Sequence, residues 1–170
     1  MAIPWHQNDT LFRTQVNAGR GWEAYVAYKL IAAGFEVHVP SFFIRPTVAQ
    51  RKAYRDIRDM VVEGKEIEIK SSSRFFTCPD DHPDENIMVD TCEKVDSKGE
   101  PFAFLIVSQE TGEVIAIPGK TRELWKVKKG FDRVRKIEES WYVCPASVTR
   151  TFDEFLQALE KVKNNKLEDK

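Results

Sequence analysis

The sequence has little cysteine, no long apolar run and almost no net charge. Its three cysteines, Cys78, Cys92 and Cys144, are an odd and sparse set, which argues against a disulfide framework and favours a reducing compartment. No apolar stretch approaches the roughly 18 residues that a membrane-spanning helix needs, and the first residues lack the apolar core of a signal peptide. We therefore expect a soluble, intracellular, cytoplasmic protein that makes no membrane contact.

The charge balance excludes a uniformly basic surface. Lysine and arginine number 26 against 27 acidic residues, a formal net charge of −1, so any contact with nucleic acid must come from local patches. A chain of 170 residues that is 42% hydrophobic can build one well-packed core and is short for two. We expect residues 1–170 to form a single domain.

The segment 59–73 predicts a β-hairpin with a charged face. Val61 and Val62 favour a strand, Gly64 favours a turn, and charged residues alternate with isoleucine from Glu66 to Lys70. A two-residue loop at Gly64-Lys65 would place Asp59 opposite Lys70 and Val61 opposite Glu68. Asp59, Glu68 and Lys70 would then share one face, whereas a three-residue loop would turn Asp59 away.

An ordinary hairpin is the competing interpretation, because strands with one charged and one apolar face are common in half-solvated sheets. The triplet Glu-x-Lys occurs three times, at 63–65, 68–70 and 168–170, so it is not specific by itself. Only the triplet at 68–70 comes after a strand that begins with an aspartate and then a turn. This context separates it from the other two.

An amphipathic helix is predicted over 18–33. Asn17 can cap it, apolar residues recur from Trp22 to Ala33, and Gly34 can end it. Glu23 lies on its apolar face, where an ionised carboxylate needs a partner. A functional role, a solvent-facing rim position and pairing with Arg20 or Lys29 all stay open. Gly19 leaves a smooth surface one turn before Glu23, where a phosphate backbone could approach.

The rest of the chain predicts a mixed α/β fold. A short strand is expected at 35–39, a buried strand at 101–107, its hairpin partner at 114–117 and another strand at 141–143. The capping box Thr151-x-x-Glu154 should open a C-terminal helix over about 152–165. We expect a central mixed sheet flanked by helices.

The order of these motifs resembles the PD-(D/E)xK nuclease superfamily, which includes restriction endonuclease-like and Holliday junction resolvase-like enzymes. The resemblance covers residues 17–73 and consists of Gly19-x-x-x-Glu23, Gly34-Phe35-Glu36-Val37, Asp59 and Glu68-Ile69-Lys70-Ser71-Ser72. It implies an α/β fold with a restriction endonuclease-like αβββαβ core.

Two departures from the family pattern are visible. Arg58 stands where that pattern often has proline, and Asp56 competes with Asp59 for the ligand role. The stretch at about 40–58 is long for a strand connection and rich in arginine, which predicts a basic insertion.

The resemblance also implies a catalytic role for each matching residue. Asp59, Glu68 and the backbone carbonyl of Ile69 would hold Mg²⁺, for which Mn²⁺ should substitute. Lys70 would orient or help deprotonate the attacking water. Glu23 would bind a second ion or position a metal-bound water.

The implied activity is metal-dependent hydrolysis of DNA phosphodiester bonds by an endonuclease. Restriction, resolvase, homing and phage-type roles stay open, and a homodimer is the assembly that cutting two strands favours. The alternative is a DNA-binding or structural module that keeps the fold without catalysis.

DNA contacts are expected from two basic patches, at 40–58 and at 120–136, and from the strand end after Lys70. Trp125 and Phe131 interleave the second patch, where they could pack on sugars or bases, although a core position is the more common use. The expected DNA-binding residues are Arg20, Arg51, Lys52, Arg55, Ser71, Ser72, Arg74, Lys126, Lys128 and Lys129.

A zinc site is a weaker alternative near the hairpin. Cys78, His82 and Cys92 offer suitable ligands, but the sequence has no Cys-x-x-Cys pair. The acidic loop at 79–85 lies in the same region and is either a solvated surface or a segment that repels nonspecific DNA.

Overall fold

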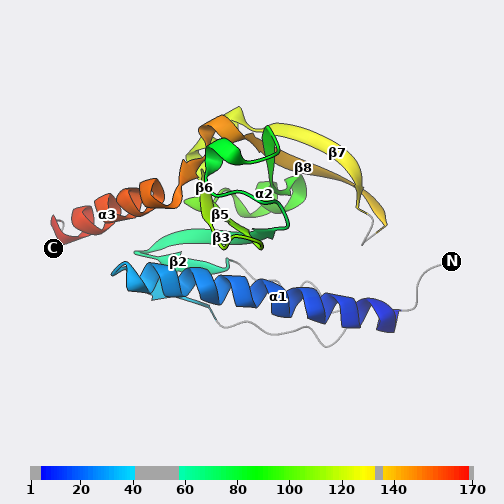
Figure 1. Ribbon diagram of the computed structural model, residues 1–170, viewed down its shortest axis with the longest axis horizontal. Coiled ribbons are helices and arrows are strands. Elements are labelled where there is room, and N and C mark those ends of the chain that lie inside the picture. The colour runs from blue at the N-terminus through cyan, green and yellow to red at the C-terminus, as the bar shows by residue number, and fades with distance from the viewer. Residues whose placement is uncertain (1–4, 41–57, 133–135, 169–170) are drawn as a thin grey trace.

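A central sheet is covered by two helices on one face and by a smaller sheet on the other (Figure 1). The computed structural model describes residues 5–40, 58–132 and 136–168, with the backbone alone for 5–13 and 15–17. Almost all of the expected basic insertion, including Arg51, Lys52, Arg55 and Asp56, lies outside these ranges. Within them, no helix combines the length and the apolarity needed to cross a membrane.

The elements follow one another in a mixed order. The helices are α1 (Trp5–Ala32), α2 (Cys92–Lys98) and α3 (Phe152–Glu168). Short 3₁₀ turns occur at η2 (Pro79–Asp81), η3 (Gly119–Leu124) and η4 (Ala146–Val148). The strands are β1 (Val37–His38), β2 (Met60–Val62), β3 (Lys65–Ser72), β4 (Asn86–Thr91), β5 (Ala103–Ser108), β6 (Val114–Pro118), β7 (Lys126–Asp132), β8 (Ile137–Pro145) and β9 (Arg150–Thr151).

The central sheet is mixed, as the sequence predicted. Its strand order is β1-β2-β3-β5-β6-β9. Strand β3 pairs antiparallel with β2 and parallel with β5, whereas β5, β6 and β9 are joined by antiparallel pairs. A parallel pair needs a crossover connection, and here the crossover contains β4 and α2. Strand β4 joins β8 and β7 in the second sheet.

The two faces of the central sheet contribute to two hydrophobic cores. One core joins Ile67 and Ile69 to Leu30 of α1 and Leu159 of α3. The second joins alternate residues of β5 and β6, such as Phe104, to the smaller sheet. Because side chains alternate along a strand, Glu68 and Lys70 are directed to the face that meets the smaller sheet and α2.

The first helix is longer than predicted. It begins at Trp5 instead of 18, so the prediction of an N-cap at Asn17 is wrong, because the polar stretch before 18 continues the helix. The predicted end is confirmed: Gly34 has a φ of 88°, Gly34 N donates to Ile31 O at 2.9 Å, and Phe35 N donates to Leu30 O at 3.1 Å. A left-handed glycine that closes these bonds is a common helix terminus.

The hairpin turn lies one residue earlier than predicted. Glu63 and Gly64 form the loop, with φ values of 49° and 77°, and β2 pairs Val62 with Lys65 and Met60 with Ile67. The predicted loop at Gly64-Lys65 and the pairs Asp59–Lys70 and Val61–Glu68 are therefore wrong. Partners shift by two residues, which preserves the alternation, so Asp59, Glu68 and Lys70 still share a face.

Contacts from distant segments explain the position of this turn. Glu63 is buried, its N–H donates to Glu36 O at 3.0 Å, and its Oε1 accepts from Glu36 N at 2.9 Å. Its Oε2 also lies 3.6 Å from Lys166 Nζ of α3. A type I′ loop requires positive φ at both central residues, and these contacts hold Glu63 there despite its side chain.

The remaining predicted elements are found with shifted ends. The strands predicted at 101–107 and 114–117 are β5 and β6, and that at 141–143 is the middle of the longer β8. The capping box is confirmed, since Thr151 N donates to Glu154 Oε2 at 2.8 Å and Glu154 N donates to Thr151 Oγ1 at 3.2 Å. Strand β7 and its pairing with β8 were not predicted.

Replacing Glu63 with alanine should destabilise the fold. The variant loses the contact to Glu36 N and places an alanine at positive φ, so we expect the free energy of unfolding to fall by about 1–3 kcal/mol. Urea denaturation followed by circular dichroism measures it. The neighbouring exposed Lys65→Ala is the control and should change stability by less than about 0.5 kcal/mol. Equal stability of both variants would contradict the role given to Glu63.

Candidate active site

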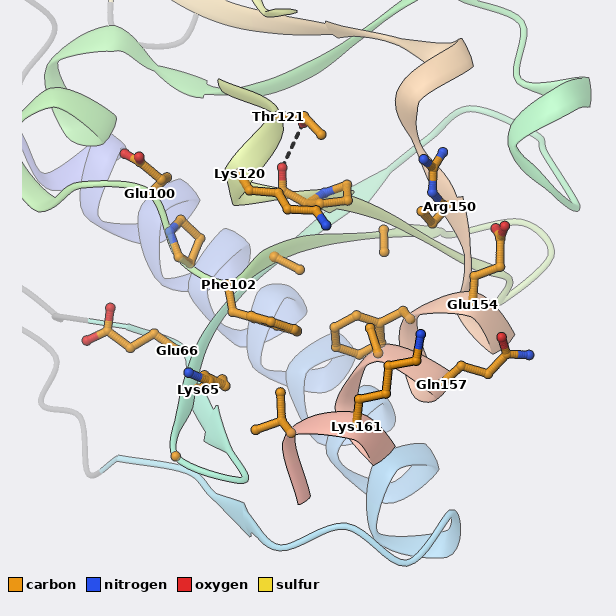
Figure 2. Close-up of a pocket in the computed structure, with 18 residues that line it drawn as sticks. Lys65, Glu66, Glu100, Phe102, Lys120, Thr121, Arg150, Glu154, Gln157 and Lys161 are labelled. Atoms are coloured by element: carbon orange, nitrogen blue, oxygen red, sulfur yellow. Dashed lines mark hydrogen bonds between the residues drawn. The ribbon is translucent and has the colours of Figure 1, made fainter. Parts of the chain in front are cut away.

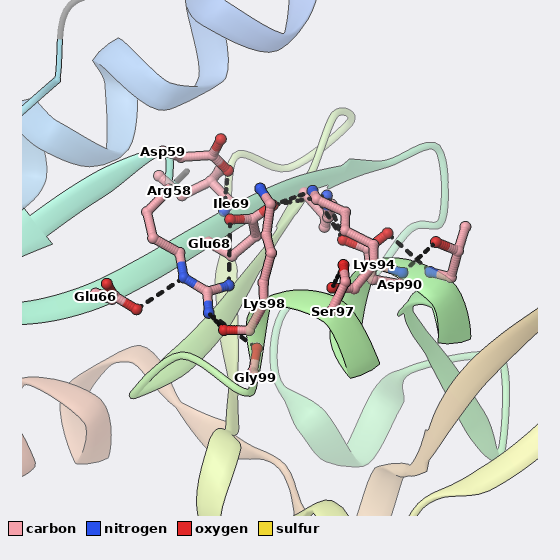
Figure 3. Close-up of polar contacts among 12 residues, drawn as sticks. Arg58, Asp59, Glu66, Glu68, Ile69, Asp90, Lys94, Ser97, Lys98 and Gly99 are labelled. Atoms are coloured by element: carbon pink, nitrogen blue, oxygen red, sulfur yellow. Dashed lines mark hydrogen bonds and ion pairs between the residues drawn. The ribbon is translucent and has the colours of Figure 1, made fainter. Parts of the chain in front are cut away.

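Three predicted residues of the hairpin meet at its open end, where β2 begins. Glu68 is 1% exposed, although carboxylates are seldom fully buried. Asp59 precedes β2, and its Oδ2 accepts a hydrogen bond from Ile69 N at 2.7 Å, which fixes the aspartate against the neighbouring strand (Figure 3). Lys70 Nζ lies 3.4 Å from Glu68 Oε1. The structure thus brings together Asp59, Glu68 and Lys70.

Cations surround the buried carboxylate of Glu68. Its Oε1 contacts Lys94 Nζ as well as Lys70 Nζ. Its Oε2 lies 4.0 Å from Arg58 Nη1, and among the described residues this oxygen is buried and has no hydrogen-bond partner. The unsatisfied oxygen of a buried carboxylate is unusual in a folded protein, and it marks a position where a further cation or donor would be favourable.

Arg58 is a structural neighbour of this cluster. Its guanidinium is buried and donates to Glu66 at 2.9 Å, to Lys98 O at 3.0 Å and to Gly99 O at 2.9 Å. The residue therefore ties the hairpin to the end of α2 (Figure 3). This contact gives a reason for arginine at the position where the family pattern often has proline.

Asp90 and Lys94 complete the cluster, and sequence reasoning missed both. Lys70 Nζ lies 2.9 Å and Lys94 Nζ 3.0 Å from Asp90 Oδ2. Asp90 is the last residue but one of β4, and Lys94 lies in the first turn of α2, where its N–H donates to the capping Thr91 Oγ1 at 3.2 Å. The alternating residues before Asp90 followed by the cap at Thr91 would have predicted this strand-to-helix junction.

The pKa values follow from burial and from these charges. Burial and the nearby Glu68 raise the pKa of Asp59. Burial alone would also raise the pKa of Glu68, but Lys70 and Lys94 outweigh it and hold that pKa below its usual value. The pKa of Asp90 is likewise lowered, because the same two lysines outweigh the effect of burial.

Lys70 keeps its proton in this arrangement. Burial would lower its pKa, but Asp90, Glu68 and Asp59 outweigh burial and raise it above the usual value for lysine. A protonated lysine donates hydrogen bonds and stabilises negative charge. Of the two roles that the family resemblance implies, orienting a water or a phosphate fits the geometry better than removing a proton.

Glu23 makes a contact within its own helix. It forms an ion pair with Arg20, three residues earlier on α1, which is one of the alternatives that the sequence left open. The buried neighbours Val26 and Leu30 belong to the core on the opposite face of the sheet from Glu68. A catalytic role for Glu23 stays a prediction, and the same ion pair occupies Arg20, one of the expected DNA-binding residues.

The other expected DNA-binding residues fall into two groups. At the end of β3, Ser71 Oγ accepts from Gln109 at 3.0 Å, Ser72 Oγ accepts from Arg74 N at 3.1 Å, and Arg74 pairs with Asp84 at 2.9 Å. The lysines Lys126, Lys128 and Lys129 are exposed on β7. The two aromatic residues of that patch differ in burial, since Trp125 is buried in the core and Phe131 is 54% exposed.

No zinc site is formed in the described part of the chain. There, no group of three or more histidine, cysteine, aspartate or glutamate side chains is arranged to hold a metal ion. His82 instead packs on Phe76, with ring centroids 5.0 Å apart. Mg²⁺ needs fewer protein side chains, because it is often held by one or two carboxylates together with water and substrate phosphate.

A pocket of about 950 Å³ lies away from the charged cluster, between α3 and the ends of β3, β5 and β6. Phe102 and Phe155 are among its apolar lining residues, and Lys65, Lys120 and Glu154 are among its charged ones (Figure 2). None of the residues that the sequence singled out for catalysis lines it. The charged cluster is therefore the candidate active site.

Comparison with known proteins found no matching family model, no matching curated protein and no matching solved structure.

Replacing Asp59 with asparagine should stabilise the metal-free protein near pH 7. The raised pKa means that the ionised carboxylate destabilises the fold above that pKa, and this cost disappears as falling pH protonates it. In EDTA we expect a gain of roughly 0.5–2 kcal/mol at pH 7 and a smaller gain at pH 4, measured by urea denaturation. Glu110→Gln, at an exposed turn, is the charge-matched control. A loss of stability at pH 7 would contradict the electrostatic argument.

Proposed function

We propose that this protein is a metal-dependent DNA endonuclease of the PD-(D/E)xK type that hydrolyses phosphodiester bonds. The observation that carries the proposal is the convergence of Asp59, Glu68 and Lys70 on one face of the hairpin, with Glu68 buried and one of its oxygens unsatisfied. Burying charged groups in this way costs free energy, and perturbed acids gathered at one point are typical of functional sites.

The order of elements supports the same proposal. Helix α1 is followed by the antiparallel strands β1, β2 and β3, then by α2, and then by β5 parallel to β3. This is the αβββαβ order that the resemblance implies, with β4 added to the crossover. The triplet Glu68-Ile69-Lys70 lies in β3, where pairing with β5 on one side and the hydrogen bond from Ile69 N to Asp59 on the other hold its backbone.

The residues present fit a magnesium ion. Asp59 and Glu68 offer carboxylate oxygens close enough that the charge of Glu68 raises the pKa of Asp59, and Glu68 Oε2 has no hydrogen-bond partner among the described residues. These two carboxylates, with the backbone carbonyl of Ile69, would hold Mg²⁺ or Mn²⁺. When bound, the ion supplies Lewis-acid activation of a water and stabilises charge on the phosphate.

The residues of the chain have separate tasks in this reaction. Ile69 N holds Asp59 through Oδ2, and Oδ1 of the same carboxylate would face the ligand. Lys70 is a charged donor that can orient the attacking water and stabilise negative charge on the phosphate. Asp90, at 2.9 Å from Lys70 Nζ, sets the direction of that donor.

DNA binding is assigned to the ribbon of β7 and β8 together with the end of β3. Ribbon residues 126–132 and 137–143 pair antiparallel, and Figure 1 shows the ribbon extending away from the central sheet. Lys126 and Lys128 are exposed and share one face of β7 with Gly130. Beyond Trp141, β7 and β8 continue without β4. A two-stranded ribbon fits a duplex groove, and the lysines at its base would contact phosphates.

A non-catalytic DNA-binding or structural module is the second candidate. One observation favours it: without metal, the carboxylates of Glu68 and Asp90 are already paired with Lys70 and Lys94. A closed network of ion pairs can serve folding alone. Such a module would bind DNA in a salt-dependent way and would leave it uncut.

Cleavage assays decide between these functions. Plasmid, branched and linear DNA should be cut with Mg²⁺ and left intact with EDTA. Lys70→Ala should lower the cleavage rate by roughly 10²–10⁴-fold and retain DNA binding, because the lysine acts on the reacting groups. Lys161→Gln on α3, which makes the same change in net charge, should cut like the wild type. No metal-dependent cleavage of any substrate would refute the enzyme, and full activity of Lys70→Ala would refute the role of the lysine.

Replacing Lys126 and Lys128 together with glutamine should weaken DNA binding. Each lysine that contacts a phosphate adds roughly one unit to the slope of log K against log salt concentration, so we expect the slope to fall by about two. Fluorescence anisotropy with a labelled duplex at several salt concentrations measures it. The charge-matched control is Lys65 and Lys161, both replaced with glutamine at the rim of the pocket. An unchanged slope in the ribbon variant would show that DNA binds elsewhere.

A further inference from the structure

Asp90 and Lys94 enter the candidate site from a rigid junction. Strand β4 pairs with β8 up to Thr91, and α2 begins at the next residue with Thr91 as its cap. Ile87, Val89 and Val95 on either side are buried in the second core. The backbone of Asp90 and Lys94 is thereby fixed, and their spacing of four residues across the junction directs both side chains to Glu68 and Lys70.

Each of the two ammonium groups bridges two carboxylates. Lys94 Nζ contacts Glu68 Oε1 and lies 3.0 Å from Asp90 Oδ2. Lys70 Nζ lies 2.9 Å from Asp90 Oδ2 and 3.4 Å from Glu68 Oε1. Lys94 Nζ thus contacts both carboxylates, and Lys70 Nζ lies closer to Asp90 than to Glu68. Figure 3 shows Lys94 and Asp90 beside Glu68.

A divalent cation would enter this arrangement beside several positive charges. The acids Asp59, Glu66, Glu68 and Asp90 face Arg58, Lys70, Lys94 and Lys98, so formal charges already balance. A metal ion held by Asp59 and the unsatisfied Glu68 Oε2 would lie close to the ammonium group on Oε1 of the same carboxylate, and like charges in a partly buried site repel strongly. Withdrawal of one ammonium from Glu68 would relieve this repulsion, and Asp90 already provides Lys94 with a second acceptor.

We propose that Lys94 is the resting counterion of Glu68, that the metal ion replaces it there, and that Asp90 is the positioning residue which retains Lys94 and Lys70 after this exchange. The inference rests on the proposed function, since it concerns metal binding at the same site. Lys94 neutralises a buried carboxylate that would otherwise be costly without metal, and it lowers metal affinity until substrate phosphate adds negative charge. The site thus has a built-in preference for binding metal together with DNA.

Calorimetric titration of Mn²⁺ into the protein without DNA tests this exchange. Lys94→Met removes the competing cation, so we expect Kd for Mn²⁺ to fall roughly tenfold. Lys94→Arg keeps the charge and should bind like the wild type. Asp90→Asn removes the second acceptor of Lys94, so Lys94 stays on Glu68 and this variant should bind Mn²⁺ more weakly than the wild type. Lys161→Gln controls for net charge and should leave Kd unchanged.

Thermal unfolding with and without Mn²⁺ supplies a second measurement. Lys94→Met should have a lower Tm than the wild type in EDTA, because Glu68 loses a counterion. Saturating Mn²⁺ should then raise its Tm by more than it raises that of the wild type, since tighter binding to the native state stabilises more. A variant that is only partly stable without metal still reports the exchange in this way.

The outcomes separate the inference from the proposed function. If the wild type cuts DNA but Lys94→Met binds Mn²⁺ no more tightly, Lys94 is not a competing counterion and the inference is overturned while the nuclease stands. If Lys94→Met binds Mn²⁺ more tightly but no DNA is cut, the exchange is supported and the nuclease is refuted. If neither the wild type nor Lys94→Met binds Mn²⁺ without DNA, the inference is overturned, and the cleavage assay alone decides the nuclease.

Discussion

The burial of the Glu68 carboxylate is the constraint on which the site depends. A carboxylate that is 1% exposed is stable in ionised form only if cations surround it. Those cations come from separate parts of the chain: Arg58 precedes β2, Lys70 lies two residues along β3, and Lys94 lies on α2. The approach of α2 to the hairpin is therefore an electrostatic requirement as well as a packing arrangement, and the contacts of Arg58 with Lys98 O and Gly99 O reinforce it.

The apolar side of β3 determines which way these charges point. Ile67 and Ile69 are buried against the helices, and the parallel pairing with β5 fixes the register of β3 in the sheet. A slip of one residue would exchange the isoleucines for Glu66, Glu68 and Lys70 in that core, at a cost of several buried charges. The orientation of the candidate catalytic side chains is thus enforced by hydrophobic packing on the opposite face.

The smaller sheet connects the charged cluster to the exposed ribbon. Asp90 lies near the end of β4, β4 pairs with β8, and β8 pairs with the lysine-bearing β7. At the base of this sheet, Trp125 packs on Phe104 of the central sheet and on Tyr142 of β8. One aromatic residue of the basic stretch therefore anchors the ribbon, while Phe131 lies exposed beyond it. Asp90 of the charged cluster and the exposed lysines of β7 therefore lie on one supporting sheet.

By itself the sequence determined what depends on short-range patterns. The alternation along 59–70 predicted that Asp59, Glu68 and Lys70 share a face, and this survived the error in the turn because a shift of two residues preserves the alternation. Gly34 and the capping box at Thr151 were likewise local signals. Only the tertiary structure decided that Glu63 occupies the turn and that Asp90 and Lys94 reach Glu68. The decisive contact joins residues 26 positions apart, and ion pairs of this kind depend on chain folding that local patterns do not encode.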